Sequence, residues 1–222
     1  MSSTFYVTTP IYYVNALPHL GSVYTNVVSD VIARFARLDG NDVKFLTGTD
    51  EHGQKVEKSA EVAGMSPQAF VDSIACNFET LNHLTNISND DFIRTTEERH
   101  IKGVVAFWKK LVEKGYIYLG SYQGWYSVRD EAFYAESEIH NGKAPTGAPV
   151  EWVEEPSYFF KLSAFQEKLL TYYVENPDFI APASRRNEVI QFVKSGLTDL
   201  SISRTSFRWG ISVPENSEQK YV

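Results

Sequence analysis

The sequence predicts an α/β fold with a parallel sheet, interrupted by an inserted second domain. Strand-like and helix-like segments alternate through residues 1–115, a pattern typical of βαβ units with parallel strands. From residue 116 the chain becomes aromatic and rich in turn residues (YIYLGSYQGWYSV, 116–128), which favours antiparallel strands. We therefore expect a first parallel part in 1–115 and an inserted domain in 116–207.

The first elements follow from the residue pattern. Residues 5–14, FYVTTPIYYV, are rich in strand-forming residues and predict a strand. Apolar residues then recur three and four apart over 23–35, which predicts one apolar face of a helix. Pro18 suits the first turn of that helix, and LDGN at 38–41 ends it. Residues 42–48, DVKFLTG, predict the next strand and complete a βαβ unit.

Capping and stop signals mark the later helices. Ser66 followed by Pro67 predicts an N-cap and a first-turn proline. Thr95 with Glu98 predicts a capping box. Residues 140–152, HNGKAPTGAPVEW, predict a loop. Three predicted helices end at glycines, namely Gly64, Gly115 and Gly196.

Composition and charge exclude several classes of protein. The 222 residues have a net charge of −7 and a pI near 5.3, so a nucleic-acid contact would need a local basic patch. Cys76 is the only cysteine, which excludes an internal disulfide and any multi-thiolate zinc or iron–sulfur site. No apolar run reaches the roughly 18 residues of a membrane span, and the N-terminus lacks a signal-peptide pattern. We expect a cytoplasmic protein with no membrane partner.

The first loop is a candidate phosphate site. Ligands of open parallel sheets bind beyond the carboxyl ends of the strands, and a helix N-terminus offers unpaired N–H groups to phosphate. His19 and Gly21 lie at such a helix start. His19 would donate to developing negative charge, and Gly21 would let a ligand approach the backbone. Taken alone, however, His19 is more simply interpreted as a surface histidine.

The second strand ends in another polar loop. TGTDEHGQK, residues 47–55, brings Asp50, Glu51 and His52 to the same predicted sheet edge as His19. Asp50 is suited to accept a substrate ammonium group. An aspartate that merely caps the following helix is an equally good interpretation of this loop.

Together, PIYYVNALPHLGS and FLTGTDEHGQK resemble the methionyl-tRNA synthetases in their bacterial form. The blocks DDFIRTTEERH, GWYSVRDEAF, EWVEEPSYFFKLS, RRNEV and DLSISR follow in the same order and extend the resemblance over nearly the whole chain. The resemblance implies a class I aminoacyl-tRNA synthetase with a Rossmann-type sheet split by a connective-peptide insertion. On this basis, 208–222 would start a second catalytic half. It further implies a methionine–tRNA ligase that uses ATP and Mg²⁺ to form methionyl-adenylate and transfers methionine to tRNA(Met).

The resemblance also assigns the ATP side of the site. His19, Gly21 and Ser22 match the family's ATP-binding signature, with His19 and Ser22 in the catalytic positions. That signature usually ends in a second histidine, and here Ser22 takes its place. Because serine is shorter and uncharged, we expect weaker ATP activation than an imidazole would give.

The methionine side is assigned in the same way. Ile11 and Tyr13 match positions that line the methionine pocket. Asp50 matches the carboxylate that receives the methionine ammonium, and Arg204 matches an arginine that supports this carboxylate. For Arg204 taken alone, the simpler interpretation is a surface ion pair that contributes little to stability.

Two further departures from the family pattern concern zinc binding and the rate of the ATP-dependent reaction. Ser127 and Asp130 stand where relatives have the first Cys-x-x-Cys of a zinc knuckle, so we expect no zinc. The family's lysine-rich loop, which clamps the ATP phosphates, is absent from the 222 residues. We therefore expect this chain alone to be inactive.

Other interpretations remain open. The chain could be a non-catalytic nucleotide-binding fragment, or part of a class I synthetase for another apolar amino acid. Trp125, Tyr126 and Arg129 could contact the tRNA 3′ end, although an aromatic ribbon that packs within its own domain explains them more simply.

Overall fold

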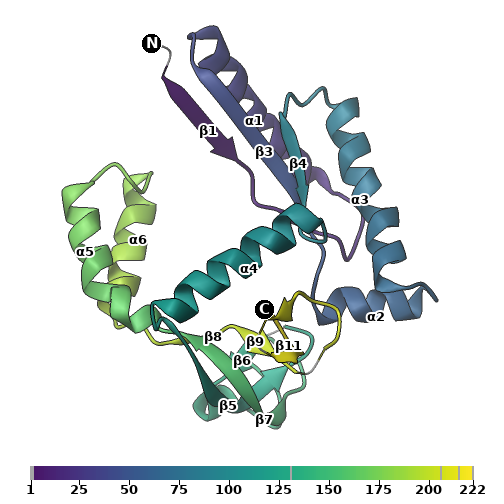
Figure 1. Cartoon of the computed structure of the whole chain (residues 1–222), viewed down its shortest axis with the longest axis vertical. Helices are drawn as coiled ribbons and strands as arrows, with labels where there is room; N and C mark the ends of the chain where they lie inside the picture. The colour runs from purple at the N-terminus through teal and green to yellow at the C-terminus, as the bar shows by residue number, and fades with distance from the viewer. Residues whose placement is uncertain (1–2, 131, 206, 215, 222) are drawn as a thin grey trace. The chain divides into compact units, whose positions relative to one another are not determined.

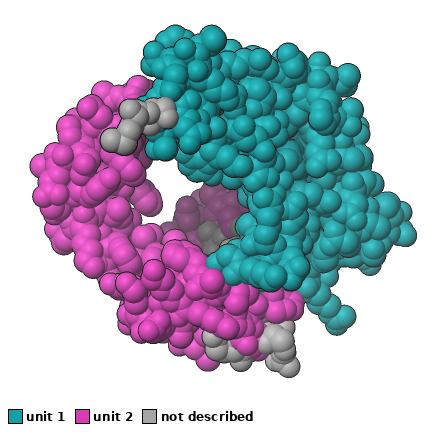
Figure 2. All heavy atoms as spheres, turned by 45° about the horizontal axis from the view of Figure 1, so that its top comes forward, with its two compact units in different colours: residues 1–104, 206–211 teal, residues 105–205, 212–222 magenta. Residues whose placement is uncertain are grey.

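The computed structural model describes residues 3–130, 132–205, 207–214 and 216–221, and it divides into two compact units. Unit 1 comprises residues 1–104 and 206–211, and unit 2 comprises 105–205 and 212–222; Figures 1 and 2 show their elements and extent. The predicted domains, 1–115, 116–207 and 208–222, were defined for the catalytic fold of the whole enzyme family, and their limits stay a prediction.

A parallel sheet forms the centre of unit 1. Its middle strand, β3 (Asp42–Asp50), pairs in parallel with β1 (Thr4–Thr8), with β2 (Tyr12–Tyr13) and with β4 (Asp91–Arg94). The predicted α/β class with a parallel sheet is confirmed. The single strand expected over 5–14 is wrong, because the chain leaves the ladder between β1 and β2, where Pro10 has no N–H to donate.

Helix α1 (Leu20–Leu38) follows β2, and His19 is its N-cap, so Pro18 lies before the helix and not in its first turn. Its predicted apolar face is largely exposed, with Val31 at 60% and Phe35 at 70% exposure. The buried face is instead formed by small and polar residues, namely Ser22, Asn26, Ser29, Asp30, Ala33 and Ala36. Small side chains let α1 approach the rest of unit 1 closely.

Helices α2 (Gln54–Val62) and α3 (Pro67–Leu84) supply most of the core of unit 1. The predicted Ser66 cap is confirmed, because its hydroxyl accepts the Ala69 N–H at 3.3 Å. The core cluster consists of Val14, Val56, Ala60, Phe70, Val71 and Phe78. Fully burying each of the larger side chains contributes about 1.5–3 kcal/mol. Through Val56 and Ala60 of α2, this core anchors the polypeptide just after the loop that follows β3.

Unit 2 is built on antiparallel strands, as the aromatic stretch predicts. The long strands β5 (Ile117–Ser127) and β7 (Glu151–Phe160) pair along their length, and β6 (Ala132–Tyr134) and β8 (Leu200–Ser201) flank them. A smaller antiparallel sheet contains β9 (Ser203–Arg204), β10 (Ser212–Val213) and β11 (Asn216–Tyr221). The remaining helical segments are α5 (Gln166–Glu175), α6 (Ala183–Lys194) and 3₁₀ turns at Glu136–Glu138 and Leu162–Phe165.

Helix α4 (Glu98–Glu113) contains the point at which unit 1 passes into unit 2. Within unit 2, Trp108 of this helix packs with Ile117 and Val213 in a buried cluster. Among the described residues, none of the helices is both long enough and apolar enough to cross a bilayer.

Candidate functional site

The carboxyl ends of β2 and β3 bring two predicted site residues together. Tyr13 and Asp50 are partners in the parallel register, and the N–H of Val14 donates to the Asp50 carbonyl at 3.2 Å. The Tyr13 hydroxyl also lies 3.0 Å from the position that a Cβ on Gly53 would take. Strand β3 extends two residues beyond the predicted end, so Asp50 is its last residue. Tyr13 and Asp50 therefore lie at the sheet edge where ligands of parallel sheets bind.

The first turn of α1 fixes the orientation of His19. Its Nδ1 accepts the N–H of Gly21 at 3.0 Å, which makes His19 the N-cap of the helix. Because Nδ1 acts as an acceptor, the neutral imidazole has its proton on Nε2. A Cβ on Gly21 would lie 2.9 Å from the His19 Cε1, so a larger residue there would displace the imidazole from this position. His19 is exposed and suited to donate from Nε2 to an anion.

Ser22 and Ile11 differ in their exposure. Ser22 is only 3% exposed, and its carbonyl accepts a hydrogen bond from the Tyr12 hydroxyl at 3.2 Å. Ile11 lies between β1 and β2 and is 41% exposed. The residue in the second histidine's place thus lies on the buried side of α1, whereas His19 is exposed. A direct contact between Ser22 and ATP stays a prediction.

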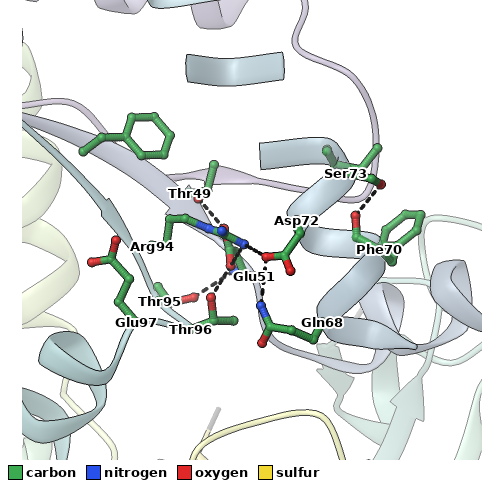
Figure 3. Close-up of polar contacts among 12 residues, drawn as sticks. Thr49, Glu51, Gln68, Phe70, Asp72, Ser73, Arg94, Thr95, Thr96 and Glu97 are labelled. Atoms are coloured by element: carbon green, nitrogen blue, oxygen red, sulfur yellow. Dashed lines mark hydrogen bonds and ion pairs between the residues drawn. The ribbon is translucent and has the colours of Figure 1, made fainter. Parts of the chain in front are cut away.

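Next to Asp50 in the chain, the Glu51 side chain is completely buried, and Figure 3 shows its polar partners. Its carboxylate accepts two hydrogen bonds from Arg94, from Nε at 2.7 Å and from Nη2 at 3.0 Å. The hydroxyls of Thr49 and Thr96 donate to it at 2.6 and 2.5 Å. A bidentate ion pair with a guanidinium, together with two hydroxyl donors, supplies the hydrogen-bond partners that a buried carboxylate requires.

The backbone of the same loop is held separately. The N–H of Glu51 donates to the Thr95 hydroxyl at 2.9 Å, and its carbonyl accepts from the indole Nε1 of Trp209 at 2.5 Å. In return, the Gly53 N–H donates to the Trp209 carbonyl at 3.0 Å. The capping box predicted at Thr95 is wrong, because its hydroxyl accepts this buried N–H and α4 begins only at Glu98.

Sequence reasoning missed Arg94, Thr96 and Trp209. Arg94 ends β4, a strand parallel to β3, so its side chain belongs to the same sheet edge. The run IRTT, in which a charged residue ends a short strand and two threonines follow, was the signal that could have indicated Arg94 and Thr96. Trp209 gave no signal, because it follows the loop by more than 150 residues of chain.

His52 is held neutral in this loop. Its ring lies 5.4 Å from that of Trp209, and burial lowers its pKa to about 4. The Glu51 charge opposes this lowering, whereas His100 adds to it. The unfolded chain, with its usual pKa near 6.5, therefore binds the proton first as the pH falls.

From this difference we expect unit 1 to lose stability as the pH falls from about 6.5 to about 4. The full loss is about 3 kcal/mol, and it is absent above pH 6.5, where both states are neutral. Guanidinium unfolding at pH 7 and pH 4.5 measures it. His52→Gln should reduce the difference between the two pH values, whereas His83→Gln, at an exposed position, should keep it. An undiminished difference in His52→Gln would contradict the expectation.

Arg204 lies in unit 2, in β9, whereas Asp50 lies in unit 1. The guanidinium of Arg204 donates from Nη1 to the Ser203 carbonyl at 2.7 Å. Its support of Asp50 therefore stays a prediction. His19, Gly21, Ile11, Tyr13 and Asp50 all belong to unit 1.

The place of the zinc knuckle is occupied by hydrogen-bonded oxygen groups. The Asp130 carboxylate accepts from the hydroxyls of Tyr134, at 2.9 Å, and Thr146. The Asp130 N–H donates to the Ser127 hydroxyl at 3.2 Å. Within the part of the chain that the structure describes, no three metal-binding side chains gather. These residues do not suit a tetrahedral thiolate site, and the absence of zinc stays a prediction.

The proposed tRNA-contacting residues pack within unit 2. Trp125 meets Trp152 edge to face, with ring centroids 5.5 Å apart. The guanidinium of Arg129 donates to the Thr146 carbonyl at 2.8 Å. These contacts are those expected of the packed aromatic ribbon, and a contact with tRNA stays a prediction.

The parallel sheet, the capped helix start and the polar loops at one strand edge define an α/β domain suited to bind a nucleotide. The family model described as "tRNA synthetases class I (M)" matches residues 5–150 and 144–222. The chain belongs to this family, the class I tRNA synthetases of the methionine type.

Individual relatives agree with the family model. The chain is 66% identical over 217 residues to the methionine–tRNA ligase of Rickettsia prowazekii (strain Madrid E) and 57% identical over 220 residues to that of Rhizobium meliloti (strain 1021). Each match covers 97% of this chain and 43% of the relative. The chain thus spans less than half the length of these relatives.

A solved structure extends the similarity to the fold. The Mycobacterium tuberculosis methionyl-tRNA synthetase in complex with methionyl-adenylate matches with a TM-score of 0.93 at 51% identity, over 99% of this chain and 44% of that one. The apo form of the M. tuberculosis enzyme matches with a TM-score of 0.81 at 47% identity, over 100% of this chain and 43% of that one.

Proposed function

We propose that the protein activates methionine with ATP to form methionyl-adenylate and pyrophosphate, and then transfers methionine to tRNA(Met). The observation that supports this most is the placement of Asp50 opposite Tyr13 at the strand edge. It occurs in a chain that is 51% identical to a synthetase solved with methionyl-adenylate. The proposal includes the cytoplasm as the place of action.

In this proposal the methionine ammonium binds the Asp50 carboxylate, with Arg204 in support. Ile11 and Tyr13 line the methionine pocket. Opposite charges about 4 Å apart attract by about 4 kcal/mol at an effective dielectric of 20, before desolvation is subtracted. This attraction would select an amino acid with a free α-ammonium group.

ATP binds at the start of α1. The His19 Nε2–H donates to a phosphate oxygen, the helix N-terminus adds its partial positive charge, and Gly21 leaves room for the nucleotide. Ser22 is the last residue of the ATP-binding signature and lies on the buried side of the helix. Mg²⁺ would enter with the ATP phosphates, which it binds through oxygen ligands.

The test is methionine-dependent exchange of pyrophosphate into ATP. It compares this chain with a protein in which the chain continues to the length of its curated relatives. We expect exchange in the longer protein only, because phosphoryl-type chemistry needs cationic clamps. Exchange that depends on valine, isoleucine or leucine would instead indicate a synthetase for another amino acid. Nucleotide binding without any exchange in the longer protein would favour a non-catalytic role.

For the Asp50 role, Asp50→Asn in the longer protein should raise the KM for methionine about 10- to 100-fold. Hydrogen bonds to charged groups contribute about 1.5–3 kcal/mol, and the amide keeps the shape while losing the charge. Steady-state exchange kinetics measure the change. Asp39→Asn, which neutralises an exposed aspartate of the same unit, is the matched control. An unchanged KM in Asp50→Asn would exclude Asp50 as the ammonium acceptor.

A further inference from the structure

The buried Glu51 carboxylate has no role in the proposed chemistry. It is completely buried, and its charge is matched by Arg94, whose side chain is 22% exposed. Desolvating such a pair costs about as much as its attraction returns, so a buried ion pair is weak evidence of stabilisation alone. Glu51 is, however, the residue directly after Asp50. Its position therefore suggests a function in orienting its neighbour.

Two independent sets of contacts hold the Glu51 residue. The side chain is fixed by Arg94 from β4 and by the hydroxyls of Thr49 and Thr96 (Figure 3). The backbone is fixed by Thr95 on its N–H and by Trp209 on its carbonyl. Every polar group of Glu51 therefore has a partner, and those partners come from segments far apart in the sequence.

The hydrogen bonds reach both sides of the loop. Trp209 bonds the Glu51 carbonyl through its indole and the Gly53 N–H through its own carbonyl. The Asp50 carbonyl, on the other side, is bonded by the Val14 N–H in the β2–β3 ladder. The peptides from 50 to 53 therefore have little freedom to rotate, and the direction in which the Asp50 Cα–Cβ bond leaves the backbone is set before any ligand binds.

We propose that Glu51 and Trp209 are positioning residues of the methionine site. Together they hold the backbone of Asp50–Gly53 so that the Asp50 carboxylate is oriented to receive the ammonium group. The inference rests on the proposed function, since it assigns these residues to the same site. Neither residue needs to touch methionine, because they act through the peptide they hold.

Two conservative variants test the two sets of contacts. Trp209→Phe keeps an aromatic ring but removes the indole N–H, and Glu51→Gln keeps the size but removes the charge. In the longer protein, each should raise the KM for methionine about tenfold and change the KM for ATP by less than about twofold. Hydrogen exchange of the 50–54 amides should become faster in Trp209→Phe, a change that a role in packing elsewhere would not produce.

Asp72→Asn is the matched control. Asp72 accepts from Nη2 of the same guanidinium at 2.6 Å, but it lies on α3 with its side chain 50% exposed, and its other hydrogen bond comes from Gln68 of the same helix. It should leave the KM for methionine unchanged. The inference, but not the proposed function, would be overturned by either of two results in an active protein. One is a methionine KM that rises as much in Asp72→Asn as in the test variants, and the other is a methionine KM that stays unchanged in both test variants. Absence of exchange in the unsubstituted longer protein would instead overturn the proposed function, and the inference with it.

Discussion

Gly48→Ala is expected to destabilise unit 1 by about 3 kcal/mol or more. A Cβ at this position would lie 2.0 Å from the Ile93 carbonyl oxygen and 2.9 Å from its carbonyl carbon. Gly48 and Ile93 are partners in the β3–β4 pair. Because the clashing atoms belong to the backbone, no rotamer change relieves them, and the two strands must separate. The strands that bring Glu51 and Arg94 together would move apart.

The measurement is guanidinium unfolding followed by circular dichroism, with hydrogen exchange of the β3 amides to report on unit 1. Gly103→Ala is the control, since a Cβ there meets nothing within 4 Å and the residue lies inside α4. It should be neutral or stabilise by up to about 1 kcal/mol, because alanine is the better helix former. If the two alanine variants unfolded at the same guanidinium concentration, the close approach of β3 and β4 would be disproved.

The sequence was most informative where local pattern and burial agree. The alternation of 1–115 predicts the parallel sheet, and the aromatic stretch 116–128 predicts the antiparallel strand β5, because each pattern extends over many residues. Its long partner β7 was not predicted. The sequence misled at α1, where the apolar stripe is exposed and the buried face is polar. Asn26 shows why: its amide joins the Tyr12 hydroxyl and Asn82 in a buried hydrogen-bond chain, a tertiary contact that no local pattern reveals.

The same limit applies to the candidate site. His19 and Asp50 could be expected at one sheet edge in advance, because the carboxyl ends of neighbouring parallel strands share an edge. Tyr13 was assigned only through the family resemblance, and the β2–β3 register places it opposite Asp50. Thr95 could not be placed correctly, since a threonine before a helix most often caps it, and only the buried Glu51 N–H redirects its hydroxyl. The contact of Trp209 with Glu51 could not be predicted, because it requires residues 206–211 to return to unit 1, and no residue spacing indicates that return.

Arg94→Met should destabilise unit 1 by about 3–5 kcal/mol, because it leaves the Glu51 carboxylate buried with only hydroxyl partners. The hydrogen bond from Arg94 to Glu51 is the main reason that the pKa of Arg94 is raised above its usual value, against the opposing effect of burial. Guanidinium unfolding of the single variants and of Arg94→Met combined with Glu51→Gln measures the coupling.

The double variant distinguishes lost packing from an uncompensated charge. If the buried charge causes the loss, neutralising Glu51 as well should recover more than half of the stability, since replacing both members of a buried pair is often nearly neutral. If the loss came from the packing of the Arg94 stem, the double variant would be no more stable than Arg94→Met. Asp72→Asn, which breaks only the half-exposed pair, should cost no more than about 1 kcal/mol. A larger cost there would shift the main role of Arg94 from the Asp50–Gly53 loop to α3.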